Sequence, residues 1–443
     1  MNAALRLAYG ALGQLARSAA VLTPNGEAKW RRSLAARRGI RNRYRAWSRH
    51  RDTTRPLLWL HAPSVGEGLQ ARVVIDLVRD RRPDIQIAYT FFSASAESFA
   101  KSLPVDFADY LPFDTPGDAA AVLQALRPTA LVFSKLDVWP VLVAEAAQRG
   151  VKLGLISGTV SEVSSREGMI ATALLHECYE SLDRVGAASD ADAGRIIALG
   201  ADPSRVVVTG DTRYDQVWRK AAMVNRGSDL LTPLASSRPT VVAGSTWPSD
   251  EAVLLDAWRE VRRDIHDARL IIAPHEPTPE HLTPIETWAA SSQLSLARIG
   301  AAGASTADVV LVDRIGVLGD LYSLATAAFV GGGFHGAGLH SVLEPAAFGA
   351  PVAFGPRHAN SRDAVMLHRS RGGDSVATTD EAIEVLQLWL SDPSARERAG
   401  TAARALVQRG LGAGERSYEL VMSLMFAETE GSRKLEAAQE RNG

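Results

Sequence analysis

The sequence contains a single cysteine, Cys178, among its 443 residues. One thiol cannot form an internal disulfide, and a zinc or iron–sulfur site that relies on cysteine ligands is excluded as well. No apolar run reaches the roughly 20 residues that cross a membrane. The stretch 5–22 is interrupted by Arg6, Gln14 and Arg17, so we expect no cleaved signal peptide. With 46% hydrophobic and 22% charged residues, the bulk of the chain is typical of globular, cytoplasmic domains.

Acidic residues are nearly absent from the first 55 positions, which hold Glu27 and Asp52 against thirteen Lys and Arg residues. The whole chain has a net charge of -1, but this head (residues 1–55) carries +11 and the remainder −12. Apolar residues within 4–22 recur at helical spacing, and tryptophan and tyrosine interrupt the basic run at 29–55. We therefore expect the head to lie on an anionic membrane surface. A basic helix packed on the protein body, or a nucleic-acid-binding arm, would share this composition, although no nucleic-acid motif accompanies it.

Short apolar runs alternate with helical patterns after the head, which predicts parallel sheets covered by helices on both faces. The strands expected in the first half are 57–61, 85–91, 130–133, 151–156, 184–188 and 205–208. Those expected in the second half are 240–244, 270–273, 309–312, 327–331, 351–354 and 374–377. The helices expected between the first strands are 68–81, 116–126, 138–149, 166–182 and 190–199.

The alternation pauses at 225–239, a stretch with Gly, Ser, Pro and Thr that reads as a linker. We therefore expect two doubly wound α/β domains, at 56–224 and 240–412, followed by a helical tail at 413–443. Ligands of such sheets bind at the carboxyl ends of the strands, so the expected site is a cleft between the two domains.

The loop after the first expected strand ends in Ser64, Gly66 and Glu67. The first two residues allow a tight turn, and a partly buried Glu67 at the start of a helix could act as a general base. The helix dipole alone also favours glutamate at this position. Lys135 and Arg213 follow other strands of the same domain and would bring positive charge to the same edge, although such side chains are usually only solvated.

A glycine-rich loop at 331–338 follows a strand of the second domain, and Ser341 is expected to cap the next helix. Free N–H groups at such a helix start suit a phosphate, and Glu344 could accept hydrogen bonds from ribose hydroxyls. Gly331, Gly333 and Gly336 spell G-x-G-x-x-G, but the loop is too long before its helix to predict a dinucleotide site.

Three further side chains end strands of the second domain. His275 could donate to a phosphate or remain an ordinary loop histidine. The hydroxyls of Ser245 and Thr246 could cap the next helix, bind an anion, or do both.

No metal site is expected. Residues 190–192 read D-A-D, which mimics a metal-binding D-x-D motif, but Ser189 precedes them and helix capping explains them better. His335 and His340 have no carboxylate or cysteine at ligand spacing. We also expect no other cofactor.

In this order, the motifs resemble those of the 3-deoxy-D-manno-octulosonate (Kdo) transferases, which add Kdo from CMP-Kdo to a lipid A precursor. The motifs are S-V-G-E at 64–67, Y-L-P-F-D at 110–114, G-D-T-R-Y-D at 210–215, A-G-S-T-W-P at 243–248, A-P-H-E-P at 273–277, G-x-L-x-x-L-Y at 316–322, V-G-G-G-F at 330–334, H-S-V-L-E-P at 340–345 and F-G-P at 354–356. The resemblance spans nearly the whole chain. It implies the α/β fold called GT-B, with two Rossmann-like domains facing a cleft, the first for the acceptor and the second for the CMP-sugar.

The resemblance also implies roles for individual residues in an inverting, metal-independent transfer. Glu67 matches the general base, Arg213 matches a residue thought to stabilise the transition state, and Lys135 is the third catalytic candidate. The acceptor-side candidates are Ser64, Gly66 and Asp137. The donor-side candidates are Ser245, Thr246, Pro274, His275, Ile315, Gly316, Val317, Gly333, His340, Ser341, Val342, Leu343 and Glu344.

The sequence departs from many family members at three of these positions. Lys135 stands where many have Glu, Ser341 where many have Asn, and His275 where many have Arg, which together look like a subgroup signature. The expected partners are CMP-Kdo, a lipid A precursor and the anionic lipid of the inner membrane at its cytoplasmic face, without nucleic acid. The alternatives are another GT-B transferase or epimerase that uses a nucleoside-diphosphate sugar, and a non-catalytic membrane- or nucleic-acid-binding protein.

Overall fold

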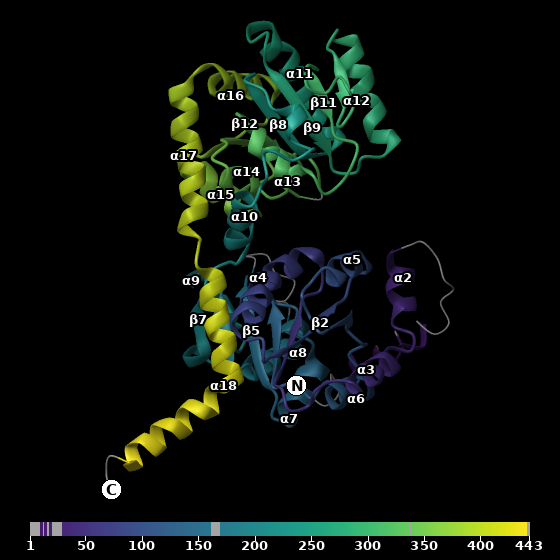
Figure 1. Ribbon diagram of the computed structural model, residues 1–443, viewed down its shortest axis with the longest axis vertical. Helices are drawn as coiled ribbons and strands as arrows, with labels where there is room; N and C mark the ends of the chain where they lie inside the picture. The colour runs from purple at the N-terminus through teal and green to yellow at the C-terminus, as the bar shows by residue number, and fades with distance from the viewer. Residues whose placement is uncertain are drawn as a thin grey trace. The chain divides into compact units, whose positions relative to one another are not determined.

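The computed structural model describes residues 9–11, 13–15, 17–19, 29–160, 169–336 and 338–440. The chain forms two compact units (Figure 1): the first unit is Met1–Gln216 with Leu411–Gly443, and the second unit is Val217–Gly410. The boundary therefore precedes the stretch 225–239 that we predicted as a linker. The tail predicted at 413–443 lies in the first unit, where its helix contacts strands of the sheet.

The described residues of the first unit form a sheet of seven strands in the order β3-β2-β1-β4-β5-β6-β7, and all neighbouring strands run parallel. The strands are β1 (Leu57–His61), β2 (Gln86–Phe91), β3 (Phe107–Tyr110), β4 (Ala130–Ser134), β5 (Lys152–Gly158), β6 (Arg184–Ala187) and β7 (Val206–Val208). The helices are α2 (Lys29–Ala36), α3 (Ile40–Ser48), α4 (Val65–Arg81), α5 (Glu97–Lys101), α6 (Pro116–Leu126), α7 (Pro140–Gln148), α8 (Met169–Glu180), α9 (Asp190–Ala198) and α18 (Ala413–Glu440), with α10 (Arg213–Ala222) crossing the unit boundary.

The second unit repeats this plan with the order β10-β11-β9-β8-β12-β13-β14, again all parallel. Its strands are β8 (Thr240–Thr246), β9 (Arg269–Pro274), β10 (Leu296–Arg298), β11 (Val309–Leu311), β12 (Ala327–Val330), β13 (Val352–Phe354) and β14 (Gly373–Ser375). Its helices are α11 (Pro248–Asp264), α12 (Pro279–Ser291), α13 (Leu318–Leu321), α14 (Leu343–Ala347), α15 (Arg362–Arg369), α16 (Thr379–Ser391) and α17 (Pro393–Arg409).

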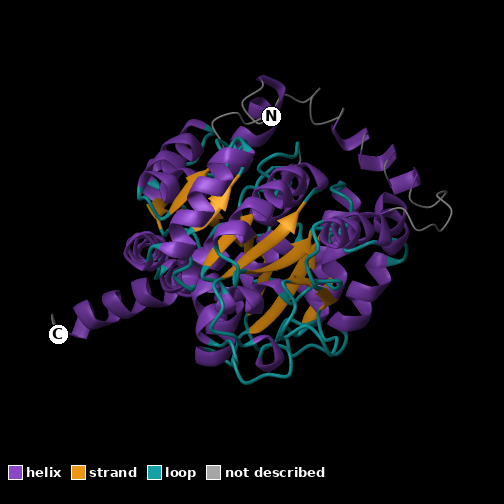
Figure 2. Cartoon of the chain, turned by 90° about the horizontal axis from the view of Figure 1, so that it is seen from above, coloured by secondary structure: helices purple, strands orange, loops and turns teal. Residues whose placement is uncertain are grey.

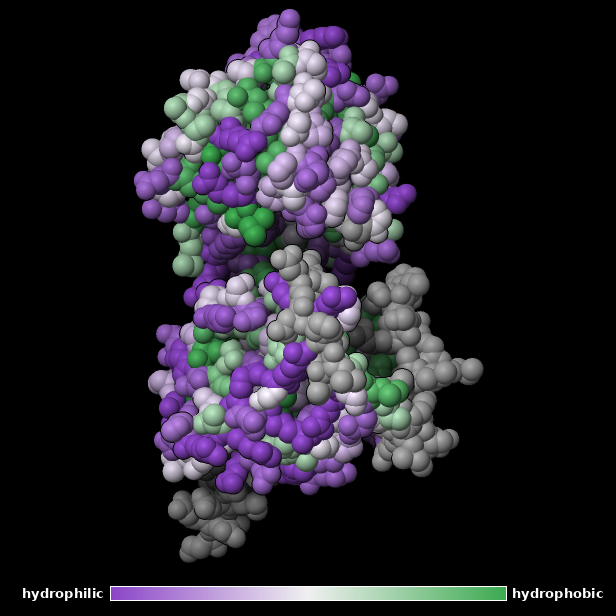
Figure 3. Space-filling model, turned by 90° about the vertical axis from the view of Figure 1, so that its right-hand side faces the viewer, coloured by the Kyte–Doolittle hydropathy of each residue, from purple (hydrophilic) through white to green (hydrophobic). Residues whose placement is uncertain are grey.

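Helices cover the strands of each sheet (Figure 2), and the central strands are buried along their whole length, as parallel sheets require. Because these strands are buried on both faces, their sequences are continuous apolar runs, and this is why the sequence predicted them. On the face that Figure 3 shows, hydrophilic residues cover much of the described surface. Strands β3 and β10 were not predicted, because F-A-D-Y and L-A-R are not continuous apolar runs, whereas the exposed edge strand β7 was predicted from its V-V-V run.

Each sheet has one place where successive connections run in opposite directions. In the first unit this topological switch point lies between β1 and β4, and in the second unit it lies between β8 and β12. Loops that leave neighbouring strands diverge there, which opens space at the carboxyl edge for a ligand. Residues that follow these four strands are therefore the best placed for function.

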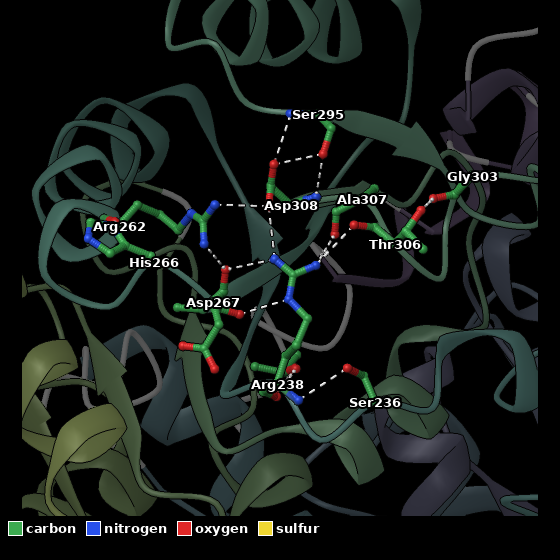
Figure 4. Close-up of polar contacts among 12 residues, drawn as sticks. Ser236, Arg238, Arg262, His266, Asp267, Ser295, Gly303, Thr306, Ala307 and Asp308 are labelled. Atoms are coloured by element: carbon green, nitrogen blue, oxygen red, sulfur yellow. Dashed lines mark hydrogen bonds and ion pairs between the residues drawn. The ribbon is translucent and has the colours of Figure 1, made fainter.

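The opposite, amino edge of the second sheet is tied together by Arg238 (Figure 4). Its guanidinium donates to the backbone oxygens of Asp267 (2.7 Å) and Thr306 (3.0 Å) and to the Asp308 carboxylate (2.9 Å). Arg262 donates to the same carboxylate (2.9 Å). Because these residues precede or connect strands, the network has a structural role at the edge away from the predicted site.

Arginines attach part of the head to the first unit. Arg37 is only 4% exposed, and its guanidinium donates to the backbone oxygens of Leu111 (2.8 Å) and Phe92 (3.1 Å). Burial lowers its pKa to about 10. Arg43 pairs with Asp109 (2.6 Å). Arg37 and Arg43 therefore pack on the protein body, which was one of the alternatives for the head. Their side chains bind groups of the protein itself.

The helix predicted at 4–22 falls partly outside the described residues. Positions 9–11, 13–15 and 17–19 are helical. Within the part of the chain that the structure describes, no helix combines the length and apolar character needed to cross a membrane.

Asp114, at the end of the Y-L-P-F-D motif, fixes the start of α7. Its buried carboxylate accepts hydrogen bonds from the backbone N–H groups of Val141 (3.0 Å) and Leu142 (2.8 Å) and from the Tyr9 hydroxyl (2.9 Å). The first N–H groups of a helix have no acceptor within the helix, and the Asp114 carboxylate, distant in sequence, is the acceptor here. Burial raises the pKa of Asp114.

We predict that Asp114→Ala lowers the free energy of unfolding of the first unit by about 1–3 kcal/mol, because buried donors lose their acceptor. Chemical denaturation followed by tryptophan fluorescence measures the change. The exposed Asp80→Ala serves as the control and should change stability by less than about 0.5 kcal/mol. Equal stability of the two variants would contradict the capping role.

Candidate active site

Glu67 lies in the first turn of α4, directly after β1 at the switch point of the first sheet. Its Oε1 accepts a hydrogen bond from Nζ of Lys135 (3.3 Å), and its Oε2 accepts one from the Ser64 hydroxyl. Its backbone oxygen accepts a bond from the Ser134 hydroxyl (3.1 Å). The ends of β1 and β4 therefore hold the carboxylate from two sides.

Three influences set the protonation state of Glu67. Burial raises its pKa, but the hydrogen bond from Ser64 and the charge of Lys135 lower it more, so the pKa lies below its ordinary value. The side chain is 18% exposed, which leaves a path for a reactant. Glu67 is thus ionised at neutral pH, ready to accept a proton.

Lys135 adopts a left-handed backbone conformation, with φ of 68°. Residues other than glycine rarely occupy this region, and such strain concentrates at functional sites. The unusual backbone lies directly after β4, where it brings Nζ of Lys135 to the Glu67 carboxylate. The sequence predicted a cation at this edge but gave no sign of the strained backbone.

Asp137 is held beside this pair by a buried histidine. Nε2–H of His61 donates to Oδ2 of Asp137 (3.1 Å), since a carboxylate only accepts, and Nδ1 then accepts from the Thr90 hydroxyl (2.9 Å). Trp139 also donates to Asp137 through its indole N–H (3.1 Å). The acceptor-side candidate Asp137 is therefore positioned by a network that sequence reasoning did not foresee.

Arg213 forms a bidentate pair with a buried carboxylate. Its Nε and Nη2 donate to Oδ2 of Asp211 at 2.8 and 2.7 Å, while Oδ1 of Asp211 accepts from the Gln70 side chain (3.1 Å). Burial raises the pKa of Asp211, but the neighbouring Arg213 lowers it more. Gln70 lies on α4 one turn after Glu67, so this helix links the two predicted catalytic residues.

In the second unit, Asp250 organises the glycine-rich loop. It is fully buried, and its carboxylate accepts from the backbone N–H groups of Trp247 (2.9 Å), Gly332 (2.8 Å) and Phe334 (3.0 Å). The loop after β12 is thereby fixed to the start of α11. Sequence reasoning missed Asp250, because an acidic residue in the first turn of a helix normally signals only capping.

Close backbone contacts explain two glycines of this loop. A Cβ on Gly331 would lie 2.3 Å from the backbone oxygen of Ser245, and one on Gly333 would lie 2.4 Å from the backbone nitrogen of Gly355. Both positions therefore require glycine for packing, whether or not a phosphate also approaches the loop. Ser245 itself has a φ of 55° at the end of β8, the counterpart of Lys135 in the first unit.

Aromatic rings gather at the carboxyl edge of the second sheet. The Trp247 ring stacks on His335 (centroids 4.3 Å apart) and on His275 (4.6 Å), and His275 stacks on His340 (4.5 Å). The indole N–H of Trp247 donates to Nε2 of His340 (3.4 Å), so this nitrogen carries no proton. Burial and the nearby His275 lower the pKa of His340 to about 4, in agreement with a neutral ring.

Two other donor-side candidates are held by internal contacts. Thr246 is buried, and its hydroxyl donates to Glu251 (2.8 Å), whose pKa is raised by burial. Glu344 pairs with Lys220 (3.7 Å), a cation that sequence reasoning did not select.

The cap predicted at Ser341 is wrong. Helix α14 begins at Leu343 with Val342 as its N-cap, without a capping hydrogen bond from a side chain, and Ser341 is exposed. The helix therefore starts one residue later than a cap at Ser341 would place it. Val342 and Leu343 are buried.

The remaining donor-side candidates lie on neighbouring loops of the second unit. Pro274 ends β9, and Ile315, Gly316 and Val317 precede α13. The Ile315 side chain is 81% exposed, and Gly316 has a φ of 90°. Within the described residues, no group of three or more His, Cys, Asp or Glu side chains could hold a metal ion.

Comparisons with known proteins match this arrangement to a family. A family model described as 3-deoxy-D-manno-octulosonic-acid transferase (kdotransferase) matches residues 34–216. A 3-deoxy-D-manno-octulosonic acid transferase of Bordetella pertussis is 28% identical over 380 residues, which cover 82% of this chain and 86% of the relative. One of Haemophilus influenzae is 24% identical over 368 residues, with the same two shares. The chain is therefore similar to Kdo transferases over about four fifths of its length.

Solved structures share the fold of this chain. The UDP-GlcNAc 2-epimerase of Neisseria meningitidis, bound to UDP-GlcNAc, has a TM-score of 0.62 at 13% identity and covers 83% of this chain and 100% of its own. A glycosyltransferase of Rickettsia africae has a TM-score of 0.56 at 10% identity, with shares of 84% and 99%. At these identities the likeness concerns the fold alone. The predicted α/β class of GT-B type is confirmed, and the protein is a glycosyltransferase.

Two motifs within the range matched by the Kdo transferase model, S-V-G-E and G-D-T-R-Y-D, supply contacts of the candidate site. The first motif supplies Ser64 and Glu67, which bond to each other at the switch point. The second supplies Asp211, which holds the predicted catalytic Arg213. Both motifs lie within the matched range 34–216.

We predict that the His340 ring titrates with a midpoint near pH 4 and is neutral throughout the physiological range. Imidazole ¹⁵N chemical shifts followed against pH measure this midpoint. Replacing His275 by Gln should raise the pKa of His340 only in part, since the electrostatic effect of His275 is lost while burial remains. A midpoint near the ordinary value of about 6.5 would contradict the neutral assignment.

Proposed function

We propose that this protein transfers Kdo from CMP-Kdo to a hydroxyl group of a lipid A precursor, with inversion at the anomeric carbon. The observation that carries the proposal is the Glu67 carboxylate, partly buried at the switch point and held by Lys135 and Ser64. The family match supports Kdo as the transferred sugar, because the relatives are named for that transfer.

In the proposed reaction, the acceptor oxygen attacks the anomeric carbon as the bond from that carbon to the phosphate oxygen of CMP breaks. Glu67 takes the proton that the acceptor hydroxyl loses. Each of its oxygens can accept a second hydrogen bond besides those from Lys135 and Ser64. A general base in position typically contributes about 10²–10⁴-fold to the rate.

The departing CMP carries one phosphate group, and hydrogen-bond donors at the carboxyl edges can stabilise its charge. We assign this role to Arg213, held rigidly by Asp211, and to His275, which stacks on Trp247. A nucleoside monophosphate has no diphosphate to neutralise, so we propose that the transfer needs neither a metal ion nor another cofactor.

We further propose that the head holds the enzyme on the anionic lipid of the cytoplasmic face of the inner membrane, where the acceptor would be reached. Arg37 and Arg43 are engaged within the protein, so this contact depends on other residues of the head. Arg31, Arg32 and Arg49 are exposed and can supply it. Each basic residue near such a surface contributes roughly 1 kcal/mol.

The substitution Glu67→Gln tests the proposed base. Glutamine keeps the size of the side chain but cannot take the proton, so we expect turnover with CMP-Kdo and lipid A precursor to fall about 10²–10⁴-fold. CMP binding, measured by calorimetry, should be unchanged, because the donor-side candidates lie in the second unit. The exposed Glu180→Gln serves as the control. Turnover of Glu67→Gln at the wild-type rate would refute the base assignment.

A competition between nucleotides separates this proposal from a transferase or epimerase for a nucleoside-diphosphate sugar. We expect CMP to bind and UDP not to displace it. Tight binding of UDP without binding of CMP would favour the alternative donor class.

The pairing of Lys135 with Glu67 predicts a shift of the pH profile. Lys135 stabilises the ionised carboxylate, so Lys135→Met should raise the pKa of Glu67. At a given acidic pH a smaller fraction of the base is then ionised, and the acid limb of kcat/KM moves to higher pH. The control Lys135→Arg keeps the positive charge and should leave the limb near its wild-type position. An acid limb that stays in place in Lys135→Met would contradict the coupling.

A further inference from the structure

The first unit contains two neighbouring cavities at the amino edge of its sheet, with volumes of about 730 and 410 Å³. Arg127, between α6 and β4, lines both of them. Arg55 and Thr129 precede β1 and β4, whereas Glu67 follows β1. A strand of five residues spans about 17 Å, so these cavities are separate from the candidate active site.

The smaller cavity has the composition of an anion site. Its polar side chains are three arginines and three threonines, with no carboxylate among the lining residues: Arg51, Arg55, Arg127, Thr53, Thr54 and Thr129. The nearest acidic residue of the turn, Asp52, is exposed and accepts hydrogen bonds from the backbone N–H (2.9 Å) and hydroxyl (2.6 Å) of Thr54.

Among the described residues, none of the three guanidinium groups forms an ion pair, although the carboxylates of Asp52 and Asp84 interact electrostatically with Arg55. Nε and Nη1 of Arg51 are buried without a hydrogen-bond partner, and Nη2 donates only to the backbone oxygen of Arg55 (3.3 Å). Arg55 donates to the backbone oxygens of Asp84 (3.0 Å) and Pro83 (2.6 Å), which are neutral acceptors. Among the described residues, no hydrogen bond or ion pair engages the guanidinium of Arg127.

The guanidinium groups of Arg51 and Arg127 lie close enough to repel each other. Burial, together with the positive charge of Arg127, lowers the pKa of Arg51. In the larger cavity, by contrast, Arg41 pairs with Asp118 and Arg149 with Glu145. In the part of the chain that the structure describes, all three arginines of the smaller cavity lack an ion pair, whereas only Arg45 and Arg127 of the four in the larger cavity do.

The backbone at Arg127 suits a glycine residue. Its φ of 44° and ψ of 59° are left-handed, a conformation that glycine adopts without steric cost and that commonly ends a helix. An arginine is disfavoured there, so replacing it with glycine removes the guanidinium without disturbing the end of the helix.

We propose that the smaller cavity is a phosphate-binding site in which Arg51, Arg55 and Arg127 surround the anion and the hydroxyls of Thr53 and Thr129 complete its hydrogen bonds. Guanidinium groups bind phosphate oxygens with paired N–H donors, and three of them here face a single cavity. The phosphate comes either from solution or from the headgroup of an anionic phospholipid.

The substitution Arg127→Gly tests the site, since it removes the guanidinium at a position whose backbone favours glycine and should preserve the fold. Arg371→Gly is the matched control, because Arg371 also has a left-handed φ (58°) and is exposed in the second unit. Calorimetric titration of the full chain with inorganic phosphate should show binding in the wild type and in Arg371→Gly, and at least tenfold weaker binding in Arg127→Gly. Equal affinity in all three proteins, or no binding by the wild type, would overturn the proposal.

Cosedimentation with vesicles distinguishes the two sources of phosphate. If a headgroup occupies the site, Arg127→Gly should bind phosphatidylglycerol vesicles less than Arg371→Gly does, and inorganic phosphate should compete with the vesicles for the wild type. If both variants bind the vesicles equally while only Arg127→Gly loses inorganic phosphate, the ligand is a soluble phosphate. Neither readout requires transferase activity, so the site can be tested whatever the sugar donor is.

Discussion

The ion pair between Glu67 and Lys135, 3.3 Å long, joins two segments that are 68 residues apart in the sequence. They meet because β1 and β4 are parallel neighbours, so that both strands end at the same edge and their outgoing loops diverge there. The pair keeps a partly buried carboxylate ionised, which burial alone would oppose. The assignment of Glu67 as a base, and the link through α4 to Arg213, both depend on this contact.

In the second unit, a buried carboxylate also fixes a loop at the carboxyl edge of the sheet, but it has no catalytic assignment. Asp250 is buried and accepts three backbone N–H groups, which fixes the glycine-rich loop after β12. Trp247, three residues earlier, carries the stack of His275 and His335. Chemistry at this edge therefore rests on a rigid loop, and the neutral state of His340 follows from its burial and its indole donor.

Much of the fold could be predicted from the sequence, since buried parallel strands are continuous apolar runs: the ranges predicted at 57–61 and 116–126 coincide with β1 and α6. Strand β3 lacks that signal, because F-A-D-Y is not a continuous apolar run. The positions of Glu67 and Lys135 follow from strand ends, but the left-handed backbone of Lys135 and the aromatic stack arise from contacts between distant segments. The predicted cap at Ser341 was wrong, since α14 begins at Leu343 with Val342 as its N-cap.

The central claim is that this protein uses CMP-Kdo and a lipid A precursor. Mass spectrometry of the lipid A precursor after incubation with the purified protein and CMP-Kdo tests it directly. The account predicts a product heavier than the precursor by one or more whole Kdo residues, formed together with free CMP. A precursor of unchanged mass, alongside transfer from a nucleoside-diphosphate sugar under the same conditions, would contradict it.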